Sequence, residues 1–156
     1  MNNPAGYPSV SGLPYAGQDL RMHHIGFVVR DISNEIEDFA ASLGAGWEGR
    51  VYQDPLQLAK VAFLHMPCST DAQIELIEPA GENSPVFQFL QKGGGLHHIC
   101  YETSDLNRQL EVMRAKGAIV VRRPRPAVAF NNRAIAWVVT KQRLLVELLQ
   151  QELEPA

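Results

Sequence analysis

The sequence contains one motif twice, and this internal duplication limits the folds open to the chain more than any other feature. Residues 22–32 and residues 96–106 each begin with an apolar residue, a His-His pair and an isoleucine, and each continues to an aspartate that can begin a helix. A glutamate lies in the last strand-like run of each copy: Glu75 follows His24 by 51 positions, and Glu147 follows His98 by 49 positions. The chain is therefore predicted to consist of two modules of one design.

Each copy opens a similar series of predicted elements: one strand, one helix and three further strands. Asp31 or Ser33 can cap the first helix, and Gly44 follows its last apolar residue. In the second copy Ser104 or Asp105 can cap the helix, and Gly117 ends it after Lys116. The later strand-like runs span residues 47–52, 58–66 and 72–77 in the first copy and residues 119–122, 133–139 and 144–149 in the second. The predicted fold class is therefore α+β, with two βαβββ modules.

The length of the chain predicts a single domain. A chain of 156 residues can build one hydrophobic core but is too short for two ordinary domains. Residues 1–20 are rich in Pro, Gly, Ser and Asn and are expected to form a flexible N-terminal tail. The domain is expected to cover residues 21–152, with module one at 21–80, a linker at 81–95 and module two at 96–152.

The composition of the chain argues against nucleic-acid and membrane partners and favours a cytoplasmic location. A net charge of −3 gives no support for sequence-independent nucleic-acid binding, which needs a basic surface. No apolar run approaches the length of a membrane span. The two cysteines form no disulfide pattern, and the N-terminus has no secretory signal, so a cytoplasmic location is expected. We expect no nucleic-acid partner and no membrane partner.

The second histidine of each His-His pair is a candidate metal ligand. Side chains alternate between the two faces of a strand, so the two histidines of a pair should point to opposite faces. The apolar rows of the two first strands place His23 and His97 on the face packed under the helices. His24 and His98 are then expected to share the opposite face.

The two repeated glutamates complete the candidate site. Glu75 and Glu147 each lie within an apolar strand, where a carboxylate is costly unless it is paired, protonated or bound to a metal. Two imidazoles and two carboxylates form a mixed nitrogen and oxygen set that suits cobalt, nickel, zinc or manganese. A single histidine or glutamate on a strand is more often a packed or solvated residue. The matched positions favour one divalent metal ion held by His24, Glu75, His98 and Glu147.

The stretch between the two copies carries a family resemblance. It reads IELIEP at 74–79, SPV at 84–86, FLQK at 89–92 and GGLHHIC at 94–100. In order and spacing it resembles the central signature of the methylmalonyl-CoA epimerases, within the vicinal oxygen chelate (glyoxalase/bleomycin-resistance) superfamily. The likeness spans residues 22–150.

The resemblance implies two modules whose sheets curl around a metal cleft, with the ligands at His24, Glu75, His98 and Glu147. It implies a divalent-metal-dependent epimerase or isomerase that forms a metal-stabilised enolate from a 2-substituted acyl thioester such as methylmalonyl-CoA. Glu147 and Glu75 are then the catalytic residues that move the proton. The implied partners are a small-molecule substrate, such as a CoA thioester, and a second copy of the chain in a homodimer.

Two positions depart from the pattern of the epimerases. Phe130 and Asn131 stand where a glycine-rich loop is expected, and Val61 stands where some epimerases have an acidic base on the third strand. The resemblance therefore specifies the metal ligands more closely than it specifies the substrate or the base.

Other functions fit parts of the sequence. The order His-Glu-His-Glu also fits a glyoxalase I-type lactoylglutathione lyase. An apolar loop around Phe130 suits a non-catalytic protein that binds or sequesters a small molecule. The run of Arg122, Arg123 and Arg125 suits either CoA phosphates or, as is more common for a run of charges, a solvated turn.

Overall fold

The computed structural model describes residues 19–67 and 72–152 of the chain, so Cys68 and residues 1–18 of the predicted tail lie outside the described residues. The elements follow one another in the order β1 (Arg21–Val28), α1 (Ile32–Leu43), β2 (Gly46–Trp47), β3 (Tyr52–Asp54), β4 (Ala59–His65), β5 (Gln73–Pro79), α2 (Phe87–Gln91), β6 (Gly95–Thr103), α3 (Leu106–Ala115), β7 (Ile119–Pro126), a 3₁₀ turn (Val128–Phe130), β8 (Ala134–Val139) and β9 (Leu145–Gln150).

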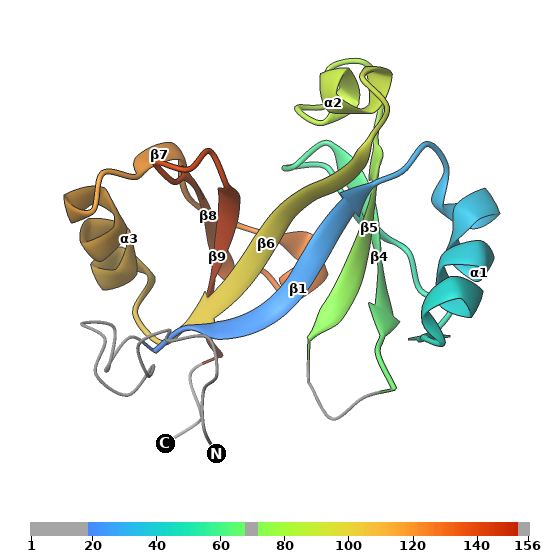
Figure 1. Cartoon of the computed structure of the whole chain (residues 1–156), viewed down its shortest axis with the longest axis horizontal. Helices are drawn as coiled ribbons and strands as arrows, with labels where there is room; N and C mark the ends of the chain where they lie inside the picture. Colours follow the sequence, from blue (N-terminus) through green and yellow to red (C-terminus); the bar gives the residue numbers. More distant parts are fainter. Residues whose placement is uncertain (1–18, 68–71, 153–156) are drawn as a thin grey trace, which may run out of the picture.

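The two halves of the chain are built alike and share one curled sheet (Figure 1). In the first half β1 pairs in parallel with β5, which pairs antiparallel with β4. In the second half β6 pairs in parallel with β9, which pairs antiparallel with β8. Antiparallel pairing of β1 with β6 joins the halves, and the strand order is β2-β4-β5-β1-β6-β9-β8-β7. The predicted α+β fold of two βαβββ modules is confirmed, whereas the exact module boundaries stay a prediction.

An aspartate begins the long helix of each module. The Asp31 side chain accepts a hydrogen bond from the Asn34 backbone N–H at 3.2 Å, and Asp105 accepts one from the Arg108 backbone N–H at 3.0 Å. Helix α1 ends at Gly44, as predicted. Of the alternatives that the sequence left open, Asp31 and Asp105 are therefore the capping residues.

Helices α1 and α3 both pack on the outer face of the sheet, and neither covers its inner face (Figure 1). Apolar side chains bury each helix against the strands of its own module because they recur at helical spacing. The buried members are Val29, Ile32, Ile36, Ala62, Leu64 and Leu76 in the first module and Leu106, Leu110, Ala136, Val138, Val146 and Leu148 in the second. Alternation along β5 and β9 then turns Glu75 and Glu147 to the inner face.

The predicted strand at residues 47–52 is wrong, because the chain forms two separate strands there. Trp47 of β2 pairs with Leu64, and Tyr52 of β3 pairs with Val61, so both strands line up along β4. Between them Gly49 has a φ of 76°, a left-handed conformation that interrupts a strand. In the second module β7 runs to Pro126 and is longer than the predicted 119–122.

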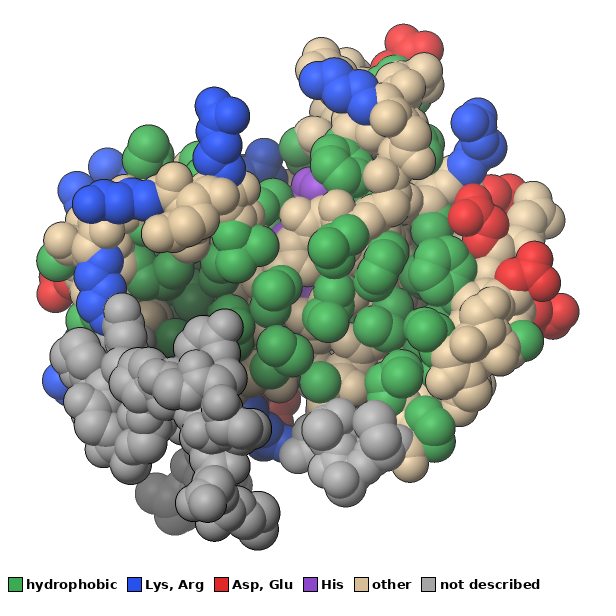
Figure 2. Space-filling view, in the orientation of Figure 1, with side chains coloured by type: hydrophobic (Ala, Val, Ile, Leu, Met, Phe, Trp, Pro, Cys, Tyr) green, Lys and Arg blue, Asp and Glu red, His purple; other side chains and the backbone are tan. Residues whose placement is uncertain are grey.

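Charge is distributed unevenly over the face seen in Figure 2. Hydrophobic side chains gather over the central strands, acidic side chains lie near α1, and basic side chains lie near α3 and β7 (Figure 2).

At the start of the described chain, Asp19 accepts a hydrogen bond from the Ser104 backbone N–H at 2.8 Å. Within the described residues, none of the helices combines the length and the apolar character needed to cross a membrane.

Candidate metal centre and its cavity

Strand register brings the first glutamate and the second histidine together. Glu75 lies opposite Gly26 in the parallel pair of β5 and β1, and Gly26 lies opposite His98 in the antiparallel pair of β1 and β6. Directly paired residues on neighbouring strands share a face. Because Gly26 has no side chain, the imidazole of His98 can lie across β1 toward Glu75.

The other two predicted ligands repeat this arrangement. Glu147 lies opposite Cys100 in the pair of β9 and β6, and Cys100 lies opposite His24 in the pair of β6 and β1. Cys100 is fully buried between them. Each module therefore sends its histidine over a small residue of the other module, and the four side chains meet on the inner face.

The structure brings all four predicted ligand side chains together in the core. Nε2 of His24 lies 3.0 Å from Nε2 of His98, 3.3 Å from Oε2 of Glu75 and 3.1 Å from Oε2 of Glu147. Nε2 of His98 lies 3.5 Å from each of the same two carboxylate oxygens. All four residues are at least 95% buried, since none is more than 5% exposed.

These distances fit a shared metal ion. Donor atoms that bind one ion at about 2.0–2.2 Å are separated from one another by roughly 3 to 3.5 Å. The ligand atoms of His24, Glu75 and His98 all lie within 4.8 Å of one another. Oε2 of Glu147 is buried and has no partner of hydrogen-bond geometry among the described residues. A buried oxygen in that state, facing two imidazole nitrogens, suits a cation ligand.

The electrostatics of the cluster also fit a cation. Burial alone would lower the pKa of His24, but Cys100 and the carboxylates of Glu75 and Glu147 raise that pKa well above its usual range. Burial alone would raise the pKa of the Glu147 carboxyl, but the adjacent imidazoles of His24 and His98 hold it well below its usual range. Two buried carboxylates thus need positive charge beside them, and a divalent ion on the same atoms would supply it.

The first histidine of each pair lies beside the cluster, so the prediction that His23 and His97 point to the face packed under the helices is wrong. The His23 ring lies 5.3 Å from the ring of Phe130, and the His97 ring lies 6.1 Å from that of Trp137, both on the inner face. The β1–β6 pairing is irregular at both histidines. The register skips His23, between Met22 and His24 on β1, and it skips His97, between Leu96 and His98 on β6. Such bulges redirect side chains. Nδ1 of His23 lies 2.9 Å from Nδ1 of His24, and the two Nδ1 atoms of His97 and His98 are 3.0 Å apart.

These two neighbours stay neutral near pH 7. Burial, together with the positive charge of the adjacent His24, lowers the pKa of His23 to about 4. Burial and the adjacent His98 lower the pKa of His97 to about 4 as well. Neutral imidazoles next to the ligand rings can fix the orientation of those rings, as hydrogen-bond partners of metal ligands commonly do.

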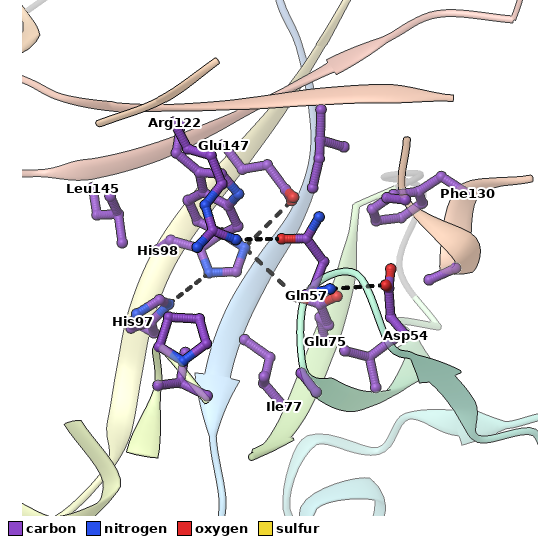
Figure 3. A pocket seen from close by; sticks show the side chains of 18 of the residues that line it. Asp54, Gln57, Glu75, Ile77, His97, His98, Arg122, Phe130, Leu145 and Glu147 are labelled. Carbon is purple, nitrogen blue, oxygen red and sulfur yellow. Dashed lines mark hydrogen bonds and ion pairs between the residues drawn. The ribbon is translucent and has the colours of Figure 1, made fainter. Parts of the chain in front are cut away.

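The cluster opens into a cavity of about 310 Å³ between the two modules (Figure 3). Glu75, His98 and Glu147 lie on its wall. Much of the remaining wall is apolar, a property typical of small-molecule sites. Its apolar side chains are Ala59, Val61, Ile77, Pro85, Val86, Val121, Ala127, Ala129, Phe130, Ile135, Trp137 and Leu145.

Sequence reasoning did not assign Asp54 and Gln57 to the site, and it favoured a solvated turn for Arg122. All three line the cavity, whereas Arg123 and Arg125 are exposed. Asp54 accepts hydrogen bonds from the backbone N–H groups of Gln57 at 3.0 Å and Val128 at 2.9 Å, which fixes two loops at the cavity. The dipeptide Asp54-Pro55 is a turn signal, but it does not reveal which distant loop the carboxylate will hold.

Gly26 tests this geometry directly. A Cβ atom on residue 26 would lie 2.2 Å from Cε1 of His98 and 2.5 Å from its Nδ1, so the imidazole would have to move. We expect Gly26→Ala to weaken metal affinity by about 10- to 100-fold, as displaced ligand rings do, and this can be measured by competition with a chromogenic chelator.

The matched control is Gly46→Ala. A Cβ at residue 46 meets nothing within 4 Å, so this variant should bind metal like the unsubstituted protein. Equal metal affinities for the two glycine variants would contradict the placement of His98 over Gly26.

Comparisons with known proteins agree with this geometry. A family model described as the Glyoxalase/Bleomycin resistance protein/Dioxygenase superfamily matches residues 23–137. The chain is similar to an ethylmalonyl-CoA/methylmalonyl-CoA epimerase from Cereibacter sphaeroides, with 31% identity over 134 residues, which are 83% of this chain and 97% of the relative.

Solved structures give the same result. Methylmalonyl-CoA epimerase from Mycobacterium tuberculosis is similar with a TM-score of 0.77 and 26% identity, and the match covers 88% of this chain and 93% of the other. A variant of the Streptomyces coelicolor methylmalonyl-CoA epimerase in complex with 2-nitronate-propionyl-CoA has a TM-score of 0.72 and 26% identity, and the match covers 85% of this chain and 98% of the other.

Proposed function

The chain belongs to the glyoxalase/bleomycin resistance protein/dioxygenase superfamily, and on that premise we propose that it is a divalent-metal-dependent epimerase that acts on a 2-substituted acyl thioester such as methylmalonyl-CoA. The observation that carries this proposal is the meeting of two imidazoles and two carboxylates at 3.0–3.5 Å in a cluster of which Glu75, His98 and Glu147 line a largely apolar cavity. The relatives that bear the names of methylmalonyl-CoA epimerases support the substrate class.

His24, Glu75, His98 and Glu147 would hold the ion. When bound there, a divalent cation supplies Lewis-acid stabilisation for negative charge that develops on a substrate oxygen. The donor set suits cobalt, nickel, zinc or manganese and does not distinguish among them.

Epimerisation requires that a proton leave one face of the α carbon and return to the other. Glu75 and Glu147 reach the cluster from strands on opposite sides of the β1–β6 pair, β5 and β9. One glutamate takes the α proton as a carboxylate, and the electron pair of the C–H bond delocalises into the thioester carbonyl as an enolate. The other glutamate, which takes up a proton from solvent before the cycle begins, returns that proton to the opposite face of the α carbon. Two carboxylates on two sides therefore suit inversion at one carbon.

Of the carboxylates that line the cavity, the two glutamates suit this role best. Val61 faces the cavity from β4, so that strand offers no acidic base at the place where some epimerases carry one. Asp54 also lines the cavity, but three backbone N–H groups occupy its carboxylate, from Leu56, Gln57 and Val128. Among the described cavity residues, Glu75 and Glu147 are thus the carboxylates available for proton transfer.

Wash-in of solvent deuterium tests the proposal. With metal-loaded protein in D₂O, the α carbon of methylmalonyl-CoA should exchange its proton many orders of magnitude faster than without enzyme, as enzymes generally achieve. Mass spectrometry or NMR of the thioester measures the exchange.

Protein treated with a chelator is the control and should lose the exchange, with recovery when metal is added back. Absence of exchange by metal-loaded protein, combined with conversion of the methylglyoxal–glutathione hemithioacetal, would replace the epimerase proposal with the lyase alternative. The homodimer and the cytoplasmic location stay predictions.

A further inference from the structure

A hydrogen bond spans the cavity between the two modules. Nη1 of Arg122, on β7 of the second module, donates to Oε1 of Gln57, in the turn between β3 and β4 of the first module, at 3.0 Å. Figure 3 shows the Gln57 side chain reaching toward Arg122 beside the cluster that contains His98. Both residues line the same cavity as Glu75, His98 and Glu147.

Both side chains keep unused donors. Nε2 of Gln57 is buried and has no hydrogen-bond partner among the described residues. Arg122 has five N–H donors, and the bond to Gln57 is the one hydrogen bond of its side chain within the described part of the chain. A buried donor without an acceptor is unfavourable, so the pair is suited to a ligand that brings acceptors.

The pair is also held in place and lies in a weakly polar setting. The backbone N–H of Gln57 is fixed by Asp54 at 3.0 Å. Arg122 is the one lysine or arginine among the described residues of the cavity wall. The cavity wall also contains buried apolar side chains such as Val61 and Ile77, and a weakly polar setting of this kind strengthens charge-assisted hydrogen bonds.

We propose that Arg122 and Gln57 together recognise the free carboxylate of the substrate, and so select acyl thioesters that carry a carboxylate on the α carbon. This inference rests on the proposed function. A carboxylate has two oxygens with about four acceptor positions. One oxygen can therefore accept from Arg122 and from Nε2 of Gln57 while the other faces the four-residue cluster, and the existing bond between the two side chains is kept.

The positions of the other arginines favour the carboxylate over the CoA phosphates as the target. Arg123 and Arg125 are exposed and do not line the cavity, whereas Arg122 is partly buried and does. A phosphate group of CoA carries several charges and is expected to stay near solvent. If Arg122 bound a phosphate, its effect would be the same for every CoA ester.

The test compares two thioesters that differ in one group. Isobutyryl-CoA has a methyl group where methylmalonyl-CoA has its carboxylate. Binding of each to the metal-loaded protein is measured by calorimetry with Arg122→Leu, Gln57→Leu and the control Arg123→Leu. We expect Arg122→Leu to weaken binding of racemic methylmalonyl-CoA on the order of tenfold to a hundredfold, and to change binding of isobutyryl-CoA less than about twofold.

The variants separate the alternatives. Gln57→Leu should give the same selective loss to a smaller extent, and it decides the matter if Arg122→Leu does not fold. Arg123→Leu should leave both affinities unchanged. Equal weakening of both thioesters would assign Arg122 to the CoA moiety and overturn the proposal, as would no change for either.

Deuterium wash-in is measured on the same samples. If deuterium washes in but Arg122→Leu does not selectively weaken binding of methylmalonyl-CoA, only the proposed carboxylate recognition is contradicted. If binding is selectively weakened but no deuterium washes in, only the proposed epimerase activity is contradicted.

Discussion

His98→Ala is expected to abolish metal retention and, with it, detectable deuterium wash-in. His98 is 1% exposed, and its Nε2 lies within 3.5 Å of the ligand atoms of the other three residues. Removing one of four donors should lower metal affinity by at least about 100-fold, since even partners of ligands are worth 10- to 100-fold. Metal content after gel filtration, measured by mass spectrometry, gives the result directly.

His65→Ala is the matched control. His65 lies at the surface, where Nε2 is 3.2 Å from Oε1 of Glu48 and both side chains are well exposed. It does not belong to the cluster, so the variant should keep its metal and its rate of exchange. Full metal content in folded His98→Ala protein would contradict the ligand set.

Glu147→Gln is expected to separate proton transfer from metal binding. The amide is nearly the same size as the carboxyl group and keeps an oxygen that can bind a cation, but it cannot accept the α proton. We expect kcat for epimerisation to fall by about 10²- to 10⁴-fold, the range that general acid–base catalysis usually contributes. Metal content should remain near that of the unsubstituted protein.

Glu78→Gln is the comparison for this variant. Glu78 is on β5 with Glu75, but its carboxylate accepts from Lys60 at 2.6 Å and from the Ile32 backbone N–H at 3.0 Å, away from the cavity wall. Its kcat should stay within a few fold of the unsubstituted value. If Glu147→Gln turned over at the unsubstituted rate with metal bound, Glu147 would be a ligand without a part in proton transfer.

The sequence allowed the fold and the four clustered side chains to be predicted for one physical reason. Duplication repeats the hydrophobic pattern of the strands and also the few polar residues within them. His24 and His98 therefore occupy equivalent strand positions, and so do Glu75 and Glu147. Alternation along a strand then decides their face. Neither inference needs knowledge of the distance between the modules.

Features that depend on pairing between distant segments could not be predicted in this way. The irregularities at His23 and His97 exist only where β1 meets β6, so alternation within one strand placed both histidines wrongly. Gln57 and Arg122 come from a turn and an edge strand separated by 65 positions, and their contact depends on how far the sheet curls. The break at Gly49 likewise follows from two short pairings with β4.

The crossing of each imidazole over the partner strand has a consequence for how such a site originates. A single module contains one histidine and one glutamate, and its histidine extends away toward the other half, so it is a half-site with little affinity of its own. Two separate modules would have to associate along their first strands before an ion could be captured. Fusing them into one chain makes that encounter intramolecular, at an effective concentration far above that of free modules. A bound ion should also stabilise the pairing of β1 with β6, because its ligands come from both modules.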